Sequence, residues 1–176
     1  MPGTRLTLAE INALDRDTFV EHFGAVFEHS PWIAAAAWPE RPFASRQMLH
    51  RAMCDVVASA SPDQQLALIQ AHPDLVGQAV LAGTLTRAST AEQAAAGLDL
   101  DRLNAEERAA FANNNRTYRE RFGFPFVICA RENKKAAILA SFVQRLDHDR
   151  EAEIAIALAE IAKIAHYRLV DLVDEA

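Results

Sequence analysis

The residue best suited to acid–base chemistry is a histidine that directly precedes a proline. His72 and Pro73 belong to the stretch AHPDLVG, which follows an apolar helical run. An imidazole titrates near neutral pH, so it can both accept and donate a proton. Pro73 disfavours the helical conformation at His72, which predicts an extended residue whose ring faces away from the helix it ends. A histidine that merely ends a helix and bonds a carbonyl group fits the same spacing, so both interpretations stay open.

A second group of polar residues follows about twenty positions later. Ser89 and Glu92 have the spacing of a capping box, a pair of reciprocal hydrogen bonds that begins a helix. This pattern explains both residues without any function. A helix N-terminus also presents free N–H groups and the positive end of the helix dipole, so a polar ligand could bind there. Gln93 would lie at the same end with two donors and one acceptor.

The last helix carries an arginine in an apolar stripe. Leu158, Ile161, Ala165, Arg168 and Leu172 are three or four residues apart and therefore share one face. A guanidinium on a core face needs a partner, because an unpaired buried charge is strongly destabilising. The partner is either an internal carboxylate or a ligand carboxylate or ureide oxygen bound in bidentate fashion.

One apolar segment, FPFVICA at residues 124–130, has the character of a buried strand without a partner strand. Its backbone N–H and C=O groups must bond to something, and in an enzyme that can be a substrate. Arg131 follows the segment and is either a second ligand-binding cation or the exposed start of a helix. Cys129 is expected to be a small core residue rather than a nucleophile.

The six histidines do not form a metal-binding pattern. The sequence has no HExxH motif, and His22 and His29 are seven residues apart rather than four. We therefore predict no metal site and no catalytic zinc.

Helix signals recur along the whole chain. Ser61 and Pro62 begin a helix that reaches about residue 71, and Gly97 is a suitable helix stop after the Ser89 start. A further helix is expected from Asn104 to about residue 121, closed by Gly123.

With 176 residues and no internal repeat or linker, the chain is expected to form one domain over residues 1–176. The predicted class is an all-α, single-domain helical bundle with one short extended segment at about 124–130.

Composition excludes several classes of protein. The formal charge is -6 and the pI about 5.5, without a dense basic stretch, so nucleic-acid binding is not expected. No apolar run approaches the length of a membrane span, so no membrane association is expected either. The two cysteines, Cys54 and Cys129, cannot form a disulfide framework. The C-terminal VDEA is not a peroxisomal address of the SKL type, and a cytoplasmic location is the simplest expectation.

Three motifs, AHPDLVG, STAEQAAAGL and RFGFPFVICAREN, occur in this order and resemble the OHCU decarboxylase family. OHCU is 2-oxo-4-hydroxy-4-carboxy-5-ureidoimidazoline, the last intermediate between urate and allantoin. The likeness extends to FVEHFGAVFEHSPWIAAAAW and RPF near the N-terminus and to AEIAKIAHYRL near the C-terminus. Three separated motifs in the right order are more specific than any one of them.

The resemblance implies an all-α homodimeric enzyme that decarboxylates OHCU to (S)-allantoin without a cofactor. It implies that His72 is the catalytic acid or base, and that Glu92 holds the histidine or a polar group of the substrate. The substrate site would be formed by the remaining matched residues: Pro73, Ser89, Gln93, Phe126, Val127, Ile128, Cys129, Ala130, Arg131 and Arg168.

Two other classes of protein remain as alternatives. A helical interaction module would use FPFVICA to pack a partner, and it predicts an exposed apolar patch and no compact polar pocket. A metal-dependent hydrolase predicts bound zinc. The ordered motifs favour the decarboxylase over both.

Overall fold

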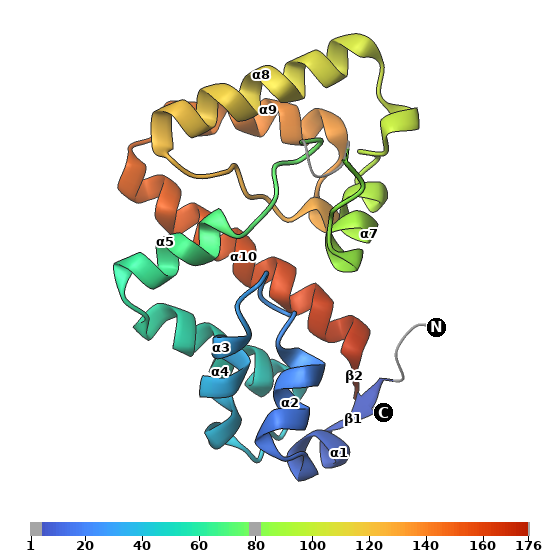
Figure 1. Cartoon of the computed structure of the whole chain (residues 1–176), viewed down its shortest axis with the longest axis vertical. Coiled ribbons are helices and arrows are strands. Elements are labelled where there is room, and N and C mark those ends of the chain that lie inside the picture. Colours follow the sequence, from blue (N-terminus) through green and yellow to red (C-terminus); the bar gives the residue numbers. More distant parts are fainter. Residues whose placement is uncertain (1–4, 78–81, 176) are drawn as a thin grey trace. The chain divides into compact units, whose positions relative to one another are not determined.

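The computed structural model describes residues 5–77 and 82–175, and these ranges are helical apart from irregular segments and two very short strands (Figure 1). The predicted all-α class is confirmed. The chain divides into two compact units, residues 1–71 with 165–176, and residues 72–164. His72 is therefore the first residue of the second unit.

The first unit contains a small helical bundle and the two strands. Its elements are β1 (Leu6–Thr7), α1 (Leu8–Ala13), α2 (Arg16–Phe23), α3 (Pro31–Ala37), η1 (Trp38–Glu40), α4 (Arg46–Ser59), α5 (Pro62–Gln70), the end of α10 (Arg150–Leu172) and β2 (Val173–Asp174). β1 and β2 pair in parallel, with Leu6 opposite Val173. Helix α3 packs against both α2 and α4.

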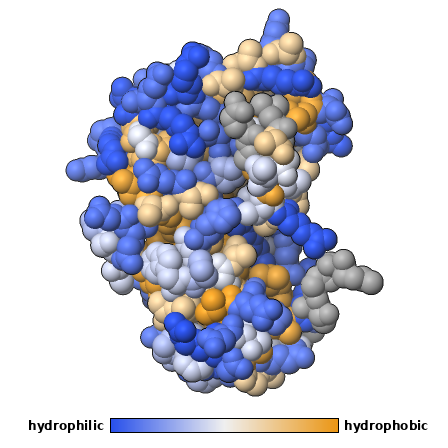
Figure 2. Space-filling view, in the orientation of Figure 1, coloured by the Kyte–Doolittle hydropathy of each residue, from blue (hydrophilic) through white to orange (hydrophobic). Residues whose placement is uncertain are grey.

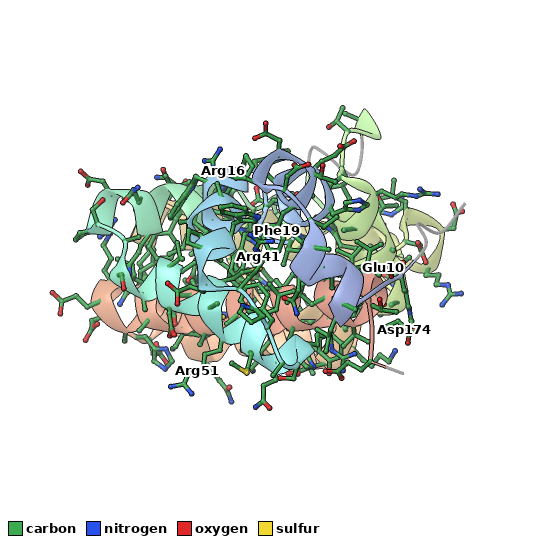
Figure 3. The ribbon with its side chains drawn as sticks, turned by 90° about the horizontal axis from the view of Figure 1, so that it is seen from below. Glu10, Arg16, Phe19, Arg41, Arg51 and Asp174 are labelled. Carbon is green, nitrogen blue, oxygen red and sulfur yellow. The ribbon has the colours of Figure 1, made fainter. Side chains whose placement is uncertain are left out.

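Local signals explain how this bundle is held. Thr7 and Glu10 form the capping box that begins α1. Arg41 donates hydrogen bonds to the carbonyl oxygens of Trp38, Asn12 and Leu14, so it joins three backbone positions of this unit. Figure 3 shows Arg41 and the fully buried Phe19 within this unit.

The second unit holds the long helices of the C-terminal half. Its elements are α7 (Arg87–Ala95), η2 (Leu100–Arg102), α8 (Ala105–Phe122), η3 (Ala130–Glu132), α9 (Lys135–Leu146) and the first part of α10. Helices α8 and α9 lie side by side (Figure 1). Aromatic side chains of α8, of α9 and of the segment between them form the core. The rings of Phe126 and Phe142 stack with centroids 3.8 Å apart, and Tyr118 meets Phe126 edge to face at 5.3 Å.

The predicted helix ends near the histidine and around α8 are confirmed. Ser61 and Gln64 form a capping box, Pro62 occupies the first helical position, and α5 ends at Gln70 just before His72. Asn104 begins α8 through a third capping box. Gly123 ends α8 with a φ of 81°, a left-handed conformation that favours glycine.

The predicted start of α7 is wrong. The helix begins at Arg87, and the N-cap is Thr86, whose Oγ1 accepts a hydrogen bond from the N–H of Ser89. Ser89 and Glu92 therefore lie inside the helix and do not form a capping box. The stop is confirmed, since Gly97 follows α7 with a φ of 79°.

The surface gives little support to an interaction module. The face shown in Figure 2 is mostly hydrophilic or intermediate, with hydrophobic side chains in scattered areas. Among the described residues, the exposed large hydrophobic side chains are Met48 in the first unit and Val143 in the second. In the same ranges, no helix is both long and apolar enough to cross a bilayer.

The aromatic core leads to a prediction about the free energy of unfolding. Replacing the fully buried Phe142 by Ala removes the ring that stacks on Phe126 and should lower the free energy of unfolding by about 3–5 kcal/mol. Its neighbour Val143 is 65% exposed, so Val143→Ala should change stability by less than about 0.5 kcal/mol. Urea unfolding of both variants measures the difference, and equal values would show that the stack is not a core contact.

Candidate functional site

The proline-linked histidine is buried at the start of an irregular turn, residues 72–77, hereafter the histidine turn. His72 is 6% exposed, and the Nε2 atom of its ring is buried. Leu75 and Val76 are buried too, whereas Pro73 and Asp74 are partly exposed. The imidazole is thus shielded from solvent rather than placed at an open helix end.

Helix α7 presents three polar side chains on one face. Ser89, Glu92 and Gln93 are 5%, 7% and 5% exposed, and their spacing of three and four residues aligns them. With the capping box ruled out, helix initiation no longer explains Glu92. Three buried polar side chains on one helix face are unusual, because buried polar groups need hydrogen-bond partners, and they make this face a candidate binding surface.

A direct hydrogen bond joins α7 to the histidine turn. The Oε1 atom of Gln93 accepts from the N–H of Val76 at 3.0 Å, and both residues are buried. Gln93 therefore fixes the turn through its oxygen. In the ranges that the structure describes, no group accepts a hydrogen bond from its Nε2, so this amide nitrogen can donate to a ligand.

The extended segment 124–130 is buried throughout, as predicted, and it forms no strand. Part of its backbone is satisfied by side chains of the protein itself. The Val127 carbonyl accepts from Nη1 of Arg145 at 2.7 Å, the Cys129 N–H donates to Oε2 of Glu160 at 2.8 Å, and the Cys129 carbonyl accepts from Asn133. A substrate is therefore not needed to pair all of these groups.

The extended segment can contact a ligand mainly through its backbone N–H and C=O groups. The ring of Phe126 is fully buried between Phe142 and the guanidinium of Arg145, which lies 4.2 Å from its centroid. Phe126 is therefore a core side chain. Within residues 5–77 and 82–175, the N–H groups of Phe126, Val127 and Ile128 meet no hydrogen-bond acceptor, so these backbone donors remain for a ligand.

Arg145 belongs to a buried polar network that secures the segment. Its Nε and Nη2 lie 2.9 Å from the carboxylate of Glu153, which is fully buried. Glu153 also accepts from the hydroxyl of Tyr118 and pairs with Nδ1 of His148 at 2.7 Å. Burial and the bond to Glu153 raise the pKa of Tyr118, so its hydroxyl stays protonated and donates. The network joins α8, α9 and α10 around the Val127 carbonyl.

These pieces converge within the second unit. Helix α7 packs against η3, and Lys134 donates to the carbonyl of Ala95 at the end of α7. Helix α7 thus contacts two parts of the candidate site. It meets η3, which continues the extended segment, and it bonds through Gln93 to the turn that begins with His72. Arg131 is partly exposed in η3.

Arg168 lies in the first unit and is 5% exposed. Its Nη1 forms an ion pair with the buried Glu28 at 2.8 Å and donates to the carbonyls of Ala25 and Val26, each at 3.3 Å. Of the two partners considered for it, the internal carboxylate is therefore present. Its contact with a substrate stays a prediction.

Neither cysteine behaves as a nucleophile. Burial raises the pKa of Cys129, and that of Cys54 to about 11, so the reactive thiolates are scarce at neutral pH. Across the described ranges, no three His, Cys, Asp or Glu side chains lie together in a geometry that could hold a metal ion.

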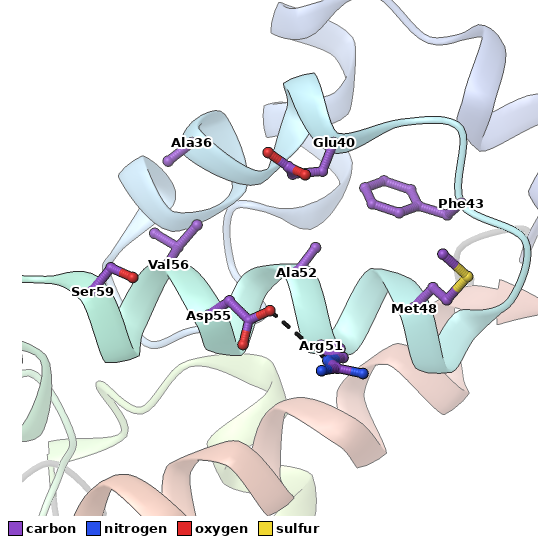
Figure 4. Close-up of a pocket in the computed structure, with 9 residues that line it drawn as sticks. All are labelled: Ala36, Glu40, Phe43, Met48, Arg51, Ala52, Asp55, Val56 and Ser59. Carbon is purple, nitrogen blue, oxygen red and sulfur yellow. Dashed lines mark ion pairs between the residues drawn. The ribbon is translucent and has the colours of Figure 1, made fainter.

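The first unit has a surface pocket of about 730 Å³ between α3 and α4 (Figure 4). Its charged lining consists of Glu40, Arg51 and Asp55, all of them exposed. Arg51 and Asp55 form a 4.0 Å ion pair one helical turn apart. This pocket contains none of the candidate site residues.

Comparison with known proteins identifies the family. A family model described as OHCU decarboxylase matches residues 12–170. This chain belongs to the OHCU decarboxylase family.

Members from distant organisms are similar over nearly their whole length. The 2-oxo-4-hydroxy-4-carboxy-5-ureidoimidazoline decarboxylase of Haloferax volcanii is 45% identical, over 94% of this chain and 95% of that protein. The protein of the same name from Mus musculus is 38% identical, over 95% of this chain and 93% of its own length.

A solved structure supports the same assignment. The crystal structure of an (S)-allantoin synthase superposes with a TM-score of 0.77 at 28% identity, covering 96% of this chain and 54% of that one. An OHCU decarboxylase crystallised in the presence of (S)-allantoin has the same fold, with a TM-score of 0.65, over 80% of this chain and 89% of its own.

Several residues around this OHCU decarboxylase-family site were not foreseen from the sequence. They are Asn115 and Arg119 on α8, which contact the histidine turn, and Arg145, Glu153 and Glu160, which support the extended segment. Only Asn115 could have been noticed in the sequence, because asparagine is a poor helix former and lies here in the middle of a helix. The others look like ordinary charged helix residues.

Breaking the Arg145 network should destabilise the protein strongly. Arg145→Met leaves the Glu153 carboxylate buried without its cation, and the free energy of unfolding should fall by about 3–5 kcal/mol. Arg102 forms a pair with Asp99 but is 71% exposed, so Arg102→Met should lose at most about 1 kcal/mol. Urea unfolding tests this, and similar small losses for both variants would contradict a buried network.

Proposed function

We propose that this protein catalyses the cofactor-independent decarboxylation of OHCU to (S)-allantoin, the last step in converting urate to allantoin. The observation that carries the proposal is the burial of His72 in a turn that bonds to α7. The Val76 N–H of this turn donates to Gln93, on a helix face that also carries the buried Ser89 and Glu92. Family membership supplies the reaction class, and this arrangement supplies a positioned proton donor or acceptor.

The chemistry of the substrate makes independence from a cofactor reasonable. Decarboxylation breaks the bond between a ring carbon and its carboxylate, and the electron pair left behind needs an acceptor. In OHCU this carbon adjoins a ring C=N bond, which takes up the pair. Carbon dioxide leaves, the ring nitrogen that received the pair takes up a proton, the hydroxyl proton departs, and a second proton is added to the neighbouring ureido-bearing carbon. The protein has to orient the substrate and move these protons.

The residues divide these tasks. His72 moves the proton as general acid or base, and Glu92 orients the imidazole or a polar group of the substrate. The Nε2 of Gln93 and backbone N–H groups of the extended segment, such as that of Ile128, donate to the amide-like edges of the ring. Proton delivery to one face then gives (S)-allantoin rather than the racemate.

The single domain, the homodimer and the cytoplasmic location belong to the proposal as well. They rest on the length of the chain, its composition and the resemblance to the family, as does binding of a substrate anion or ureide by Arg168 and Arg131. Neither nucleic acid nor membrane is proposed as a partner, since the charge is -6 and no dense basic stretch occurs.

Replacement of the histidine tests the proposed catalyst. His72→Ala should lower kcat by about 10² or more, as expected for loss of a general acid or base. His22→Ala, at an exposed histidine, should keep the activity of the parent. Stopped-flow absorbance of freshly generated OHCU gives the rates above spontaneous decay. A folded His72→Ala variant with near-parental turnover would remove His72 from the mechanism.

A matched pair of variants tests whether Arg168 binds the substrate. Arg168→Ala should lower kcat/KM by about tenfold or more, because a charge-assisted hydrogen bond to the substrate is lost. Glu28→Gln disturbs the same buried ion pair but keeps the guanidinium, and it serves as the control for indirect effects. If both variants have the same steady-state constants, Arg168 is a structural charge partner only.

A further inference from the structure

We propose that Asn115 and Arg119 of helix α8 are positioning residues that fix His72 for catalysis through the histidine turn. This inference rests on the proposed function, because it adds to the acid–base role of His72 two side chains that act on it at a distance. They form, with Gln93, a clamp on residues 74–76.

The turn is not a conformation that its own sequence favours. Val76 has a φ of 53°, and a β-branched residue in the left-handed region is strained. The turn is also tight, since a Cβ atom added to Gly77 would lie 2.6 Å from the Cβ of Asp74. Such a conformation persists only where its surroundings impose it, so contacts from outside the turn have to hold it in place.

Asn115 supplies one of these contacts at an unfavourable position. Its side chain is 6% exposed, and Nδ2 donates to the carbonyl of Leu75 at 2.8 Å. Its Oδ1 is also buried, and within residues 5–77 and 82–175 it has no hydrogen-bond partner. A buried acceptor left unsatisfied is destabilising, and asparagine disfavours the helix interior, so an apolar residue would suit α8 better. The bond to Leu75 is what asparagine provides here.

Arg119 supplies the second contact from the same helix face. It lies one turn after Asn115, and its Nε donates to both carboxylate oxygens of Asp74 at 2.9 and 3.0 Å. From α7, Gln93 accepts from the N–H of Val76. Three successive residues of the turn are therefore held by side chains of two helices.

The clamp sets the place of the imidazole. Only Pro73 separates His72 from the clamped residues, and its ring restricts the backbone on both sides. A displacement of the turn is thus passed on to the histidine. Misplacing a catalytic group by about 1 Å can cost up to 10²-fold in rate.

Helix α8 offers a matched control for this inference. Arg119→Ala removes the Asp74 contact at an exposed position, and Asn115→Leu replaces the amide by an apolar side chain of similar volume. Arg116→Ala loses only a local bond to Asn113 on the exposed side of the same helix. We expect kcat to fall about tenfold in the first two variants with KM within about twofold, and to stay unchanged in Arg116→Ala. The charge exchange Asp74→Arg with Arg119→Asp should restore part of the loss.

Proton NMR of the imidazole provides a readout that needs no activity. The His72 ring signal is assigned by its loss in His72→Ala. It should shift or broaden in Arg119→Ala and Asn115→Leu but not in Arg116→Ala. If the parent fails to decarboxylate OHCU, the proposed function fails while the ring signals still decide whether the clamp places His72. Unchanged ring signals, or an unchanged kcat in a folded Arg119→Ala variant of an active parent, overturn the proposal. If Asn115→Leu does not fold, Arg119→Ala decides alone.

Discussion

Polar backbone groups that are removed from water must find partners, and this structure depends on how the histidine turn meets that requirement. The turn cannot pair within a helix, because Pro73 ends helical geometry at His72. Side chains of Gln93 and Asn115 supply its N–H and carbonyl partners instead. The hydrogen bonds that permit burial of the turn also determine where the imidazole lies. Stability and catalysis are therefore coupled at this point of the chain.

The extended segment solves the same problem in the same way. In the part of the chain that the structure describes, no strand pairs with residues 124–130. Side chains of Arg145, Glu160 and Asn133 bond to its backbone instead. A ladder of strand hydrogen bonds would consume every donor along an edge. Pairing by individual side chains is selective, and among the described residues it leaves the N–H groups of Phe126, Val127 and Ile128 without an acceptor. In the proposed function, such donors let a helical protein bind a substrate along an extended segment without building a sheet.

Local signals in the sequence predicted what local chemistry determines. The capping residue Asn104, the left-handed Gly123 and the end of α5 before His72 follow from contacts within a few residues. The cap of α7 was misplaced because Thr86 begins the helix one turn earlier than Ser89. Contacts such as Asn115 with Leu75, forty residues apart, leave no spacing pattern in the chain. The candidate site residues were predicted from ordered motifs and stay a prediction, whereas the side chains that hold them were not foreseen.

The handedness of the product tests the central claim, that a fixed histidine protonates one face of the substrate. OHCU is generated from urate with urate oxidase and hydroxyisourate hydrolase, and circular dichroism is recorded with and without this protein. The account predicts a rapid signal of dextrorotatory (S)-allantoin that is absent without the protein and in His72→Ala. A slow, optically silent conversion equal to the control without protein would contradict it.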